Sequence, residues 1–360
     1  MNKRVFIVFL LVAAVLTAVS CSKPAEAPVQ QTNGGDAGTD TPVPADDNGG
    51  EEDKGAEKPA IVDGVVCPLG GEIIERSALY QRPVAVMMDN HSNARPQAGL
   101  DQAEVVYEIL AEGNITRYMA IFMHGENQVV GPVRSARRYF IDKSMEYDSI
   151  YVHAGGSPEA WDDVARLKIP SFDAMSMGAP LFWREKHKKE PHNMYSALDE
   201  IQKAADKKGY NKQTEVPVHA FNSADTDLEG DRAEKVSILY PPKYTVSYEY
   251  RTGDKLYYRS VMGKPHFDEV AEDYQINAKN IIIQKAAHKV VDNEGRRKID
   301  LVGKGEGIYI TNGSYVEITW EKKDRRAPTR FYSQNGEQIK LNPGKTWIQV
   351  VPFDAQISIE

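Results

Sequence analysis

Hydrophobic residues follow different patterns in the two halves of the chain. In the first half, about 68–225, continuous apolar runs of strand length, such as Val84–Met88, alternate with segments whose apolar residues recur at helical spacing, such as 98–112. In the second half, about 236–360, residues 244–250 alternate between apolar and polar with a period of two. These patterns predict an α+β protein, in which an N-terminal α/β-type domain with a mixed sheet and flanking helices precedes a mostly antiparallel β domain.

Further elements are predicted along the chain. In the first half these are strands at Ile115–Phe122 and Ser149–Val152 and a helix from Ser196 to about Lys208. Another helix is expected to run to Leu167, because Ser157 is a preferred N-cap and the proline after it suits the first helical position. In the second half, strands are expected at Leu256–Arg259, Ile281–Gln284, Gly307–Ile310, Tyr315–Trp320 and Trp347–Val351.

The N-terminus has the pattern of a secretory signal. Lys3 and Arg4 precede the apolar run Val5–Ala18, whose 14 residues are too few to span a bilayer comfortably. Small residues then lead to Cys21, an arrangement that resembles a bacterial lipobox. We therefore expect residues 1–20 to be a signal peptide and Cys21 to carry a lipid that anchors the chain to the outer face of the plasma membrane. A soluble secretion signal and an uncleaved anchor are the alternatives.

The segment 21–60 is expected to be a disordered tether. Residues 22–60 contain five prolines, six glycines and no aromatic residue, with nine acidic and three basic residues. Such a composition buries too little apolar surface to offset the entropy of ordering the chain. The folded part is then divided into an N-terminal domain at 61–230 and a β-rich C-terminal domain at 231–360.

Charge and cysteine content exclude several classes of protein. The chain has a formal charge of −8, and setting aside the leader (+2) and the tether (−6) leaves the folded part at −4. This balance gives no basis for nucleic-acid binding. If Cys21 is lipidated, Cys67 has no disulfide partner, and we expect it to be a small buried residue. The sequence shows no cofactor motif and no metal-ligand spacing, so neither a cofactor nor a metal is predicted.

Polar residues that could bind a ligand gather in the first half of the chain. Some follow a predicted buried strand, where ligands commonly bind in α/β sheets. Others are arginines, which suit bidentate contacts to phosphate or carboxylate groups. A glycine turn also precedes a predicted helix, and the free N–H groups at the start of that helix favour an anion. The alternative is that the arginines pair with nearby acidic residues. The ligand-binding candidates are Asn90, Arg95, Arg117, Arg134, Arg137, Gly155, Gly156, Ser157 and Asn193.

Three residues are candidates for acid–base chemistry. Asp89 follows the strand at 84–88, and His153 and His192 lie beside the glycine turn and in a Pro-His-Asn tract. A histidine paired with Asp89 could act as a general acid or base. The alternative is that each histidine is a hydrogen-bonded structural residue.

Several tracts also resemble one family, the YerB-like bacterial lipoproteins. The resemblance implies a two-domain envelope lipoprotein of mainly Gram-positive-type bacteria, and it implies no reaction because the function of the family is unknown. One departure is Arg138, where the family often has proline. The matching tracts are Arg82–Asn90, Ala94–Gln97, Ala111–Gly113, Ile115–Arg117, Gly131–Arg137, Tyr151–Ser157, Pro191–Asn193 and Leu341–Trp347.

These observations favour a binding protein for an anionic envelope component, such as a phosphate- or pyrophosphate-bearing lipid intermediate or a wall polymer. In this hypothesis the arginines and the 155–157 turn bind the anion. Two alternatives remain open. One is an envelope enzyme of phosphoryl or glycosyl transfer or hydrolysis, and the other is a protein-interaction scaffold for cell-wall enzymes.

Overall fold

The computed structural model describes residues 63–125, 128–214, 216 and 219–360. The expected signal peptide at 1–20, the lipidated Cys21 and the tether at 21–60 lie outside the described residues. In the described part of the chain, no helix is both long enough and apolar enough to cross a membrane.

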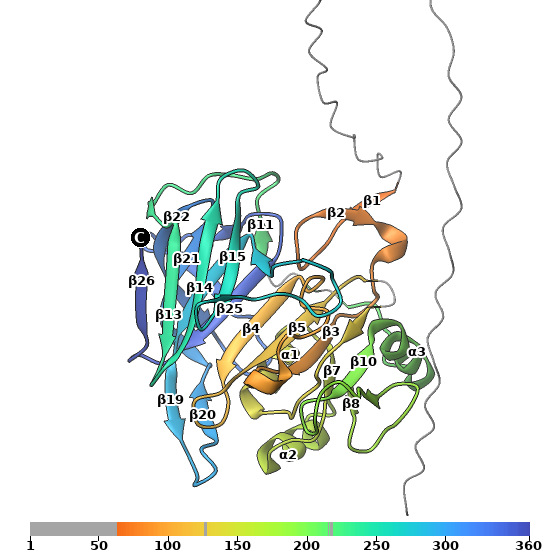
Figure 1. The fold of residues 1–360 in the computed structure, drawn as a ribbon. Coiled ribbons are helices and arrows are strands. Elements are labelled where there is room, and N and C mark those ends of the chain that lie inside the picture. Colours follow the sequence, from red (N-terminus) through yellow and green to blue (C-terminus); the bar gives the residue numbers. More distant parts are fainter. Residues whose placement is uncertain (1–62, 126–127, 215, 217–218) are drawn as a thin grey trace, which may run out of the picture. The chain divides into compact units, whose positions relative to one another are not determined.

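Eleven strands of the described residues form one mixed sheet that runs through both halves of the sequence (Figure 1). Its central pairing is between β25 (Thr346–Val351) and β4 (Val105–Leu110), which are parallel. The C-terminal strands therefore extend the N-terminal sheet. On one side of β25 the strands follow in the order β18 (Asn280–Lys285), β21 (Gly303–Thr311), β22 (Ser314–Lys322) and β12 (Asp231–Arg232). Strand β23 (Arg330–Ser333) also pairs with β22. On the far side of β4 the order is β5 (Thr116–Phe122), β3 (Val84–Asp89), β7 (Ile150–His153) and β8 (Ser171–Asp173).

A second, antiparallel sheet comes entirely from the second half. Its strands, in order, are β16 (Lys264–Pro265), β15 (Leu256–Val261), β14 (Tyr244–Arg251), β13 (Lys235–Tyr240) and β26 (Gln356–Ile359), with β17 (Asn277–Ala278) also on β15. The smaller sheets pair β1 (Gly64–Val66) with β2 (Ile73–Glu75), β10 (Met194–Ala197) with β6 (Val129–Val130) and β9 (Trp183–Arg184), β11 (Ala220–Phe221) with β24 (Lys340–Leu341), and β19 (Ala287–Val290) with β20 (Arg297–Asp300).

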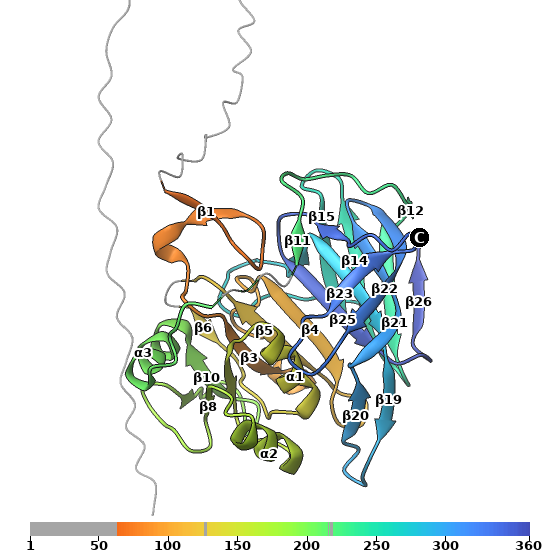
Figure 2. The ribbon, with the colours of Figure 1, turned by 180° about the vertical axis from the view of Figure 1, so that it is seen from behind.

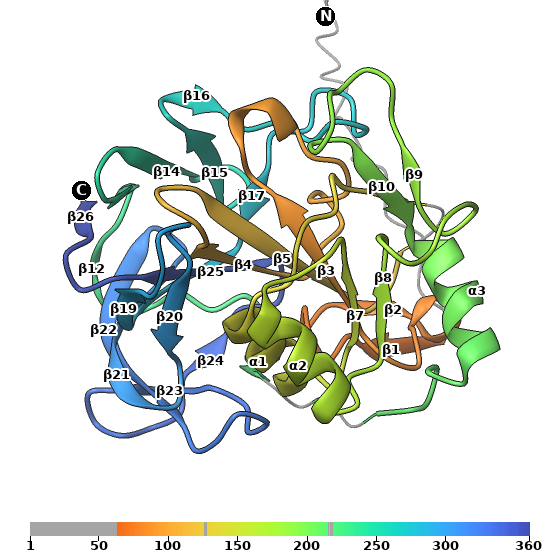
Figure 3. The ribbon, with the colours of Figure 1, turned by 90° about the horizontal axis from the view of Figure 1, so that it is seen from below.

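The described helices are α1 (Arg138–Glu146), α2 (Pro158–Arg166) and α3 (Leu198–Lys208), with short 3-10 turns at Arg76–Ala78 and Ser92–Ala94. Helix α2 begins as the sequence predicts, because the Ser157 hydroxyl accepts a hydrogen bond from the Ala160 N–H at 3.3 Å. Helices α1 and α2 lie side by side, and the β19–β20 hairpin reaches toward them, as seen from behind in Figure 2 and from below in Figure 3.

The large sheet separates two hydrophobic cores. Along β3, Val84, Val86 and Met88 face one core, and the residues between them face the other. The first core packs against β13 and β14 and against α3, and the second packs against α1. Because both faces are covered, the central strands β3 and β5 are buried at every position rather than at alternate ones.

The predicted α+β class is confirmed, with two local corrections. The predicted helix at 98–112 is wrong, because Val105–Leu110 forms the strand β4, buried between two neighbouring strands. Pairing on both edges and burial of both faces override the helical spacing of its apolar residues. Helix α1 was not predicted, because eight of its nine residues are buried and it shows no clear polar face.

Candidate functional site

Asp89, at the end of β3, is the centre of a charged cluster. Its carboxylate is 2% exposed and its Oδ2 lies 2.7 Å from His192 Nδ1. Arg134 Nε lies 3.2 Å from the same oxygen, an ion-pair distance without hydrogen-bond alignment. Asp89 Oδ1 accepts a hydrogen bond from the His91 N–H. The strand end, the arginine segment and the Pro-His-Asn tract thus meet at one carboxylate.

The loop before β10 holds His192 in this position. The Asn193 side-chain amide donates to the Glu185 carbonyl at 2.8 Å, and its oxygen accepts from Arg184 at 2.8 Å. The His91 ring stacks on His192 with 4.4 Å between centroids. Burial, followed by the charge of His192, lowers the pKa of His91. Asn193 therefore shapes the loop, and His91 adds a ring to the cluster that sequence reasoning had not selected.

Asn90 points away from this cluster into a buried polar network. Its amide donates to Thr116 Oγ1 at 2.7 Å and to the Tyr244 hydroxyl at 2.6 Å. Arg95 Nε donates to the Asn90 oxygen at 2.8 Å. Because Tyr244 belongs to the second sheet, Asn90 and Arg95 join the two halves of the protein, and the polar groups of Asn90 are already hydrogen-bonded.

Arg117 and Arg137 share one carboxylate, Glu112. Arg117 Nη2 lies 2.6 Å from Glu112 Oε2, and Arg137 pairs with Oε1. Burial, followed by the nearby charge of Arg137, lowers the pKa of Arg117 to about 10. Internal pairing is thus observed, although two arginines meet one acid. Arg134 faces Asp89 instead. Arg134 and Arg137 therefore point to different carboxylates and do not form one anion site.

The glycine turn lies against the arginine segment through its backbone. The Ala136 N–H donates to the Gly155 carbonyl at 2.9 Å, and a Cβ on Gly156 would lie 3.4 Å from Ala136 Cβ. His153 is 1% exposed, and its Nδ1 lies 2.9 Å from the Gly155 carbonyl oxygen. Burial lowers the pKa of His153. His153 therefore holds the turn, and Ser157 caps α2.

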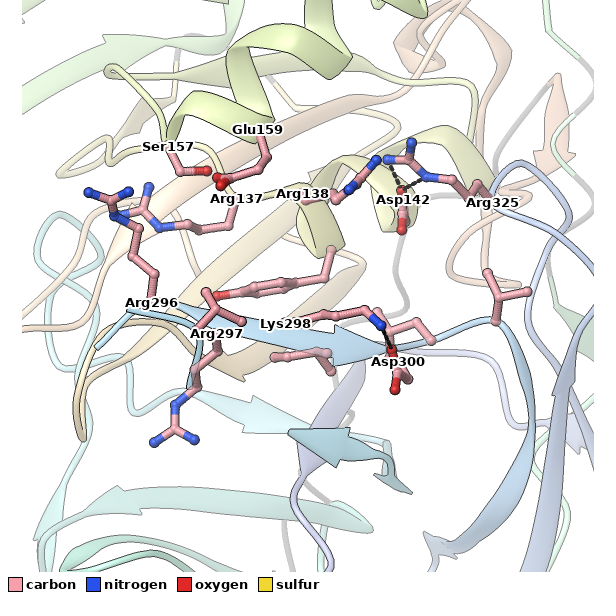
Figure 4. Close-up of a pocket in the computed structure, with 15 residues that line it drawn as sticks. Arg137, Arg138, Asp142, Ser157, Glu159, Arg296, Arg297, Lys298, Asp300 and Arg325 are labelled. Atoms are coloured by element: carbon pink, nitrogen blue, oxygen red, sulfur yellow. Dashed lines mark hydrogen bonds and ion pairs between the residues drawn. The ribbon is translucent and has the colours of Figure 1, made fainter. Parts of the chain in front are cut away.

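A pocket of about 520 Å³ opens between α1, α2 and the β19–β20 hairpin (Figure 4). Tyr139, Ile299 and Leu301 contribute apolar surface to its lining. Arg137 and Ser157 line it too, so two of the predicted ligand-binding residues meet there. The charged residues around it are Arg137, Arg138, Arg296, Arg297, Lys298 and Arg325, with Asp142, Glu159 and Asp300.

Two arginines of the pocket, Arg138 and Arg325, share acidic partners with each other and with the neighbouring Arg166. Asp163 pairs with Arg138 at 2.9 Å, with Arg166 at 2.6 Å and with Arg325 at 2.7 Å. Arg325 also reaches Asp142 at 2.6 Å. Three guanidinium groups thus share two carboxylates, just as Arg117 and Arg137 share one. Basic side chains therefore outnumber acidic ones in the pocket lining itself, while Arg296 pairs with Asp292 and Glu294 outside that lining.

The close-up shows how these side chains are arranged. Arg137 and Arg296 lie at the end near Ser157 and Glu159, whereas Arg138 and Arg325 lie at the Asp142 end (Figure 4). Arg297 points away from the others and donates to the Gly113 carbonyl at 2.8 Å. The arginines that face the cavity therefore come from α1, the loop before it, the β19–β20 hairpin and the loop after β22.

Comparison with known proteins identifies the family. Residues 69–211 match the N-terminal domain, and residues 236–348 the C-terminal domain, of a protein family of unknown function, DUF3048. The chain is 37% identical over 290 residues to "Putative lipoprotein YerB" of Bacillus subtilis (strain 168), covering 79% of this chain and 86% of the relative. The chain belongs to the DUF3048 family.

The crystal structure of the YerB protein from Bacillus subtilis supports the same DUF3048 assignment. It superposes with a TM-score of 0.73 at 35% identity, covering 82% of this chain and 99% of that one. The pocket combines residues from both DUF3048 domains, because Arg137 lies in the first and Arg296 and Arg325 lie in the second. The pocket residues of the second domain were not selected from the sequence. The run of basic residues Arg296–Lys298 was the feature that could have indicated them.

Proposed function

We propose that this DUF3048 protein is a membrane-anchored extracytoplasmic lipoprotein that binds an anionic component of the cell envelope. The lipobox-like tract at Cys21 and the name of the Bacillus subtilis relative support the anchor. The ligand class is a phosphate- or pyrophosphate-bearing lipid intermediate or wall polymer. The pocket beside α2 is the binding site.

One observation carries the proposal: six basic and three acidic side chains line the pocket, in a folded part whose net charge is −4. Positive charge is therefore concentrated at one place on an otherwise acidic body. Arginines that share carboxylates keep N–H donors available for an incoming anion. The start of α2 at Ser157 adds a partial positive charge at the same end as Arg137 and Arg296.

The apolar part of the lining adds to this argument. Val291 and Val302, which line the pocket, are 52% and 45% exposed and so offer apolar surface to a ligand. A site built only for an inorganic ion would not need such surface. The combination suits a ligand with a charged group and a sugar or lipid portion, which is the chemistry of envelope intermediates.

Calorimetric titration with inorganic pyrophosphate, and with a polyprenyl pyrophosphate in detergent, tests the proposal. We expect Arg138→Gln and Arg296→Gln each to weaken binding about tenfold or more, since a hydrogen bond to a charged group contributes about 1.5–3 kcal/mol. Weaker binding in higher salt is expected as well. If the polyprenyl ligand binds more tightly than pyrophosphate, the apolar lining contributes.

The matched control is Arg232→Gln, which removes one exposed arginine on β12. It is expected to leave the affinity unchanged. Equal loss of affinity in all three variants would mean that only the overall charge matters and would contradict the proposed site. Absence of binding by the wild-type protein would favour a scaffold that works through protein contacts.

The Asp89 cluster supports a second candidate, an envelope enzyme of phosphoryl or glycosyl transfer or hydrolysis. Asp89 orients His192 through its Nδ1, the arrangement by which a carboxylate prepares an imidazole for acid–base work. Arg134 is 25% exposed at the side chain and could contact an anionic substrate. Turnover of a lipid pyrophosphate that is abolished by Asp89→Asn, but retained by Arg296→Gln, would favour this candidate.

A further inference from the structure

Three potential metal ligands meet at an end of the large sheet, away from the pocket. Cys67 follows β1, Glu104 precedes β4, and His124 follows β5. Their Sγ, carboxylate oxygen and imidazole nitrogen atoms all lie within 4.8 Å of one another. The residues are 20 to 57 positions apart in sequence, so no ligand spacing indicated the cluster.

Hydrogen bonds from the backbone hold two of these side chains in place. The Gly70 N–H donates to Cys67 Sγ at 3.4 Å, whereas burial, followed by the charge of Glu104, raises the pKa of the Cys67 thiol to about 12 in the absence of a metal. The Met123 N–H donates to Glu104 Oε2 at 3.0 Å. The other oxygen, Oε1, is thereby left facing His124 Nε2 at 2.8 Å. Backbone support of the ligating groups is typical of metal sites.

We propose that Cys67, Glu104 and His124 bind a divalent transition-metal ion, for which Zn²⁺ is the best match. Thiolate and imidazole ligands select zinc among the common divalent ions, and a carboxylate completes a three-residue set. On binding, the Cys67 thiol releases its proton to solvent as the metal–sulfur bond forms. The proton shared between His124 and Glu104 is displaced in the same way.

The geometry requires only small shifts: separations of up to 4.8 Å contract, and the 2.8 Å separation between Glu104 Oε1 and His124 Nε2 widens. In a tetrahedral zinc site the ligand atoms lie roughly 3.3–3.8 Å apart, given metal–ligand distances of about 2.0–2.3 Å. A separation within 4.8 Å closes to this range by a shift of about 1 Å. His124 can supply that shift because its side chain is 28% exposed, whereas Glu104 is 4% exposed at the side chain. The exposed side also gives the ion a path of entry.

The Glu72 carboxylate lies near the three ligands but outside the group of atoms that are within 4.8 Å of one another, so it would have to shift to bind the same ion. A Cβ built on Gly70 would lie 3.9 Å from Cys67 Sγ and 3.7 Å from Glu72 Oε2, so the Glu72 carboxylate borders the cluster. Water, or Glu72 after that shift, can complete the coordination. The bound ion would tie the β1–β2 segment, where the described chain begins, to the central strands β4 and β5.

Cobalt titration of the full chain in detergent tests the site. Co²⁺ bound by a thiolate shows a sulfur-to-cobalt charge-transfer band in the near ultraviolet. A Cys21→Ser background removes the other cysteine, so that the band reports only Cys67. We expect an equimolar, zinc-displaceable band in this background, its loss in Cys67→Ala, and at least tenfold weaker binding in His124→Gln. His187→Gln, which removes an exposed imidazole elsewhere, is expected to bind normally.

A second measurement does not depend on the folding of the cysteine variant. Zinc is expected to raise the unfolding midpoint of the Cys21→Ser chain but not that of His124→Gln. A cobalt complex without the charge-transfer band, or a midpoint that zinc leaves unchanged, would overturn the proposal. Because the cluster shares no residue with the arginine pocket, neither result bears on anion binding.

Discussion

Arg259 of β15 donates to Glu108 of β4 at 2.5 Å, and both side chains are fully buried. The guanidinium also lies 4.6 Å from the centre of the Trp347 ring and 3.0 Å from His266 Nδ1. An ion pair between the two sheets is thus enclosed by aromatic and polar partners. Such a pair fixes how the sheets meet, because either charge alone would be buried without compensation.

Arg259→Met is expected to lower the free energy of unfolding by about 3–5 kcal/mol. The substitution leaves the Glu108 carboxylate buried, with neutral donors alone: the hydroxyls of Thr116 and Tyr244 and the Asn90 amide. Denaturant unfolding of the purified protein measures this change. The double variant Glu108→Gln/Arg259→Met should cost less than the sum of the two single substitutions, because it leaves no isolated charge.

Arg251→Met on the neighbouring strand is the control. That arginine is exposed and lies 3.5 Å from the centre of the Tyr258 ring, a contact that contributes about 0.5–1 kcal/mol at a surface. If Arg259→Met cost no more than this control, the buried ion pair would not hold the sheets together.

A second prediction concerns acid stability and His266. Arg259 donates to its Nδ1, and its Nε2 donates to Gln97 Oε1 at 2.8 Å, so the ring is held in the neutral form. Burial, followed by the charges of Arg259 and Arg95, lowers the pKa of His266 well below 6.5. Below about pH 6.5 the His266 imidazole binds a proton in the unfolded chain but not in the folded protein. The free energy of unfolding therefore decreases as the pH falls below this value.

Free energies of unfolding measured between pH 8 and pH 5 should show this effect. His266→Gln can accept from Arg259 and donate to Gln97, and it does not titrate. We expect the wild-type protein to lose more stability over this range than the variant. Parallel pH profiles for the two proteins would mean that His266 does not contribute.

A third prediction concerns the shared carboxylate Glu112. Glu112→Gln leaves Arg117 and Arg137, which are 6% and 11% exposed at the side chain, without a counter-charge. We expect a loss on the order of 2–3 kcal/mol, because a buried charge then lacks its partner. Added pyrophosphate should restore part of that loss by pairing with Arg137 at the pocket. Glu321→Gln, which breaks the exposed contact with Lys304, is the control and should cost less than about 1 kcal/mol.

A fourth prediction separates two effects at glycines of positive φ. Gly113 has φ +55° with open space around its Cβ direction, so Gly113→Ala should cost about 1–2 kcal/mol through backbone strain alone. Gly99 has φ +89°, and its Cβ would lie 2.8 Å from Val130 Cγ1 and 2.9 Å from the Val129 carbonyl oxygen. Gly99→Ala should therefore cost about 1–3 kcal/mol more in denaturant unfolding. Equal losses would show that the chain relaxes around the added methyl group.

Local pattern predicted much of the fold. The apolar run of β3, the alternation of β14 and the Ser157 cap of α2 follow from interactions within a few residues, and the structure confirms each. Local pattern failed at β4, where pairing on both edges decides the conformation, and at α1, where burial on nearly all sides hides the helical period.

The sequence by itself determined which residues carry charge, and it placed Asp89 directly after the predicted strand at 84–88. Only the tertiary structure decided which charged residues pair. His192, 103 positions away in sequence, contacts Asp89. Arg134 also pairs with Asp89, whereas Arg137 pairs with Glu112. The physical reason is that an ion pair depends on distance in space. That distance is set by how sheets and helices pack, which no local spacing encodes.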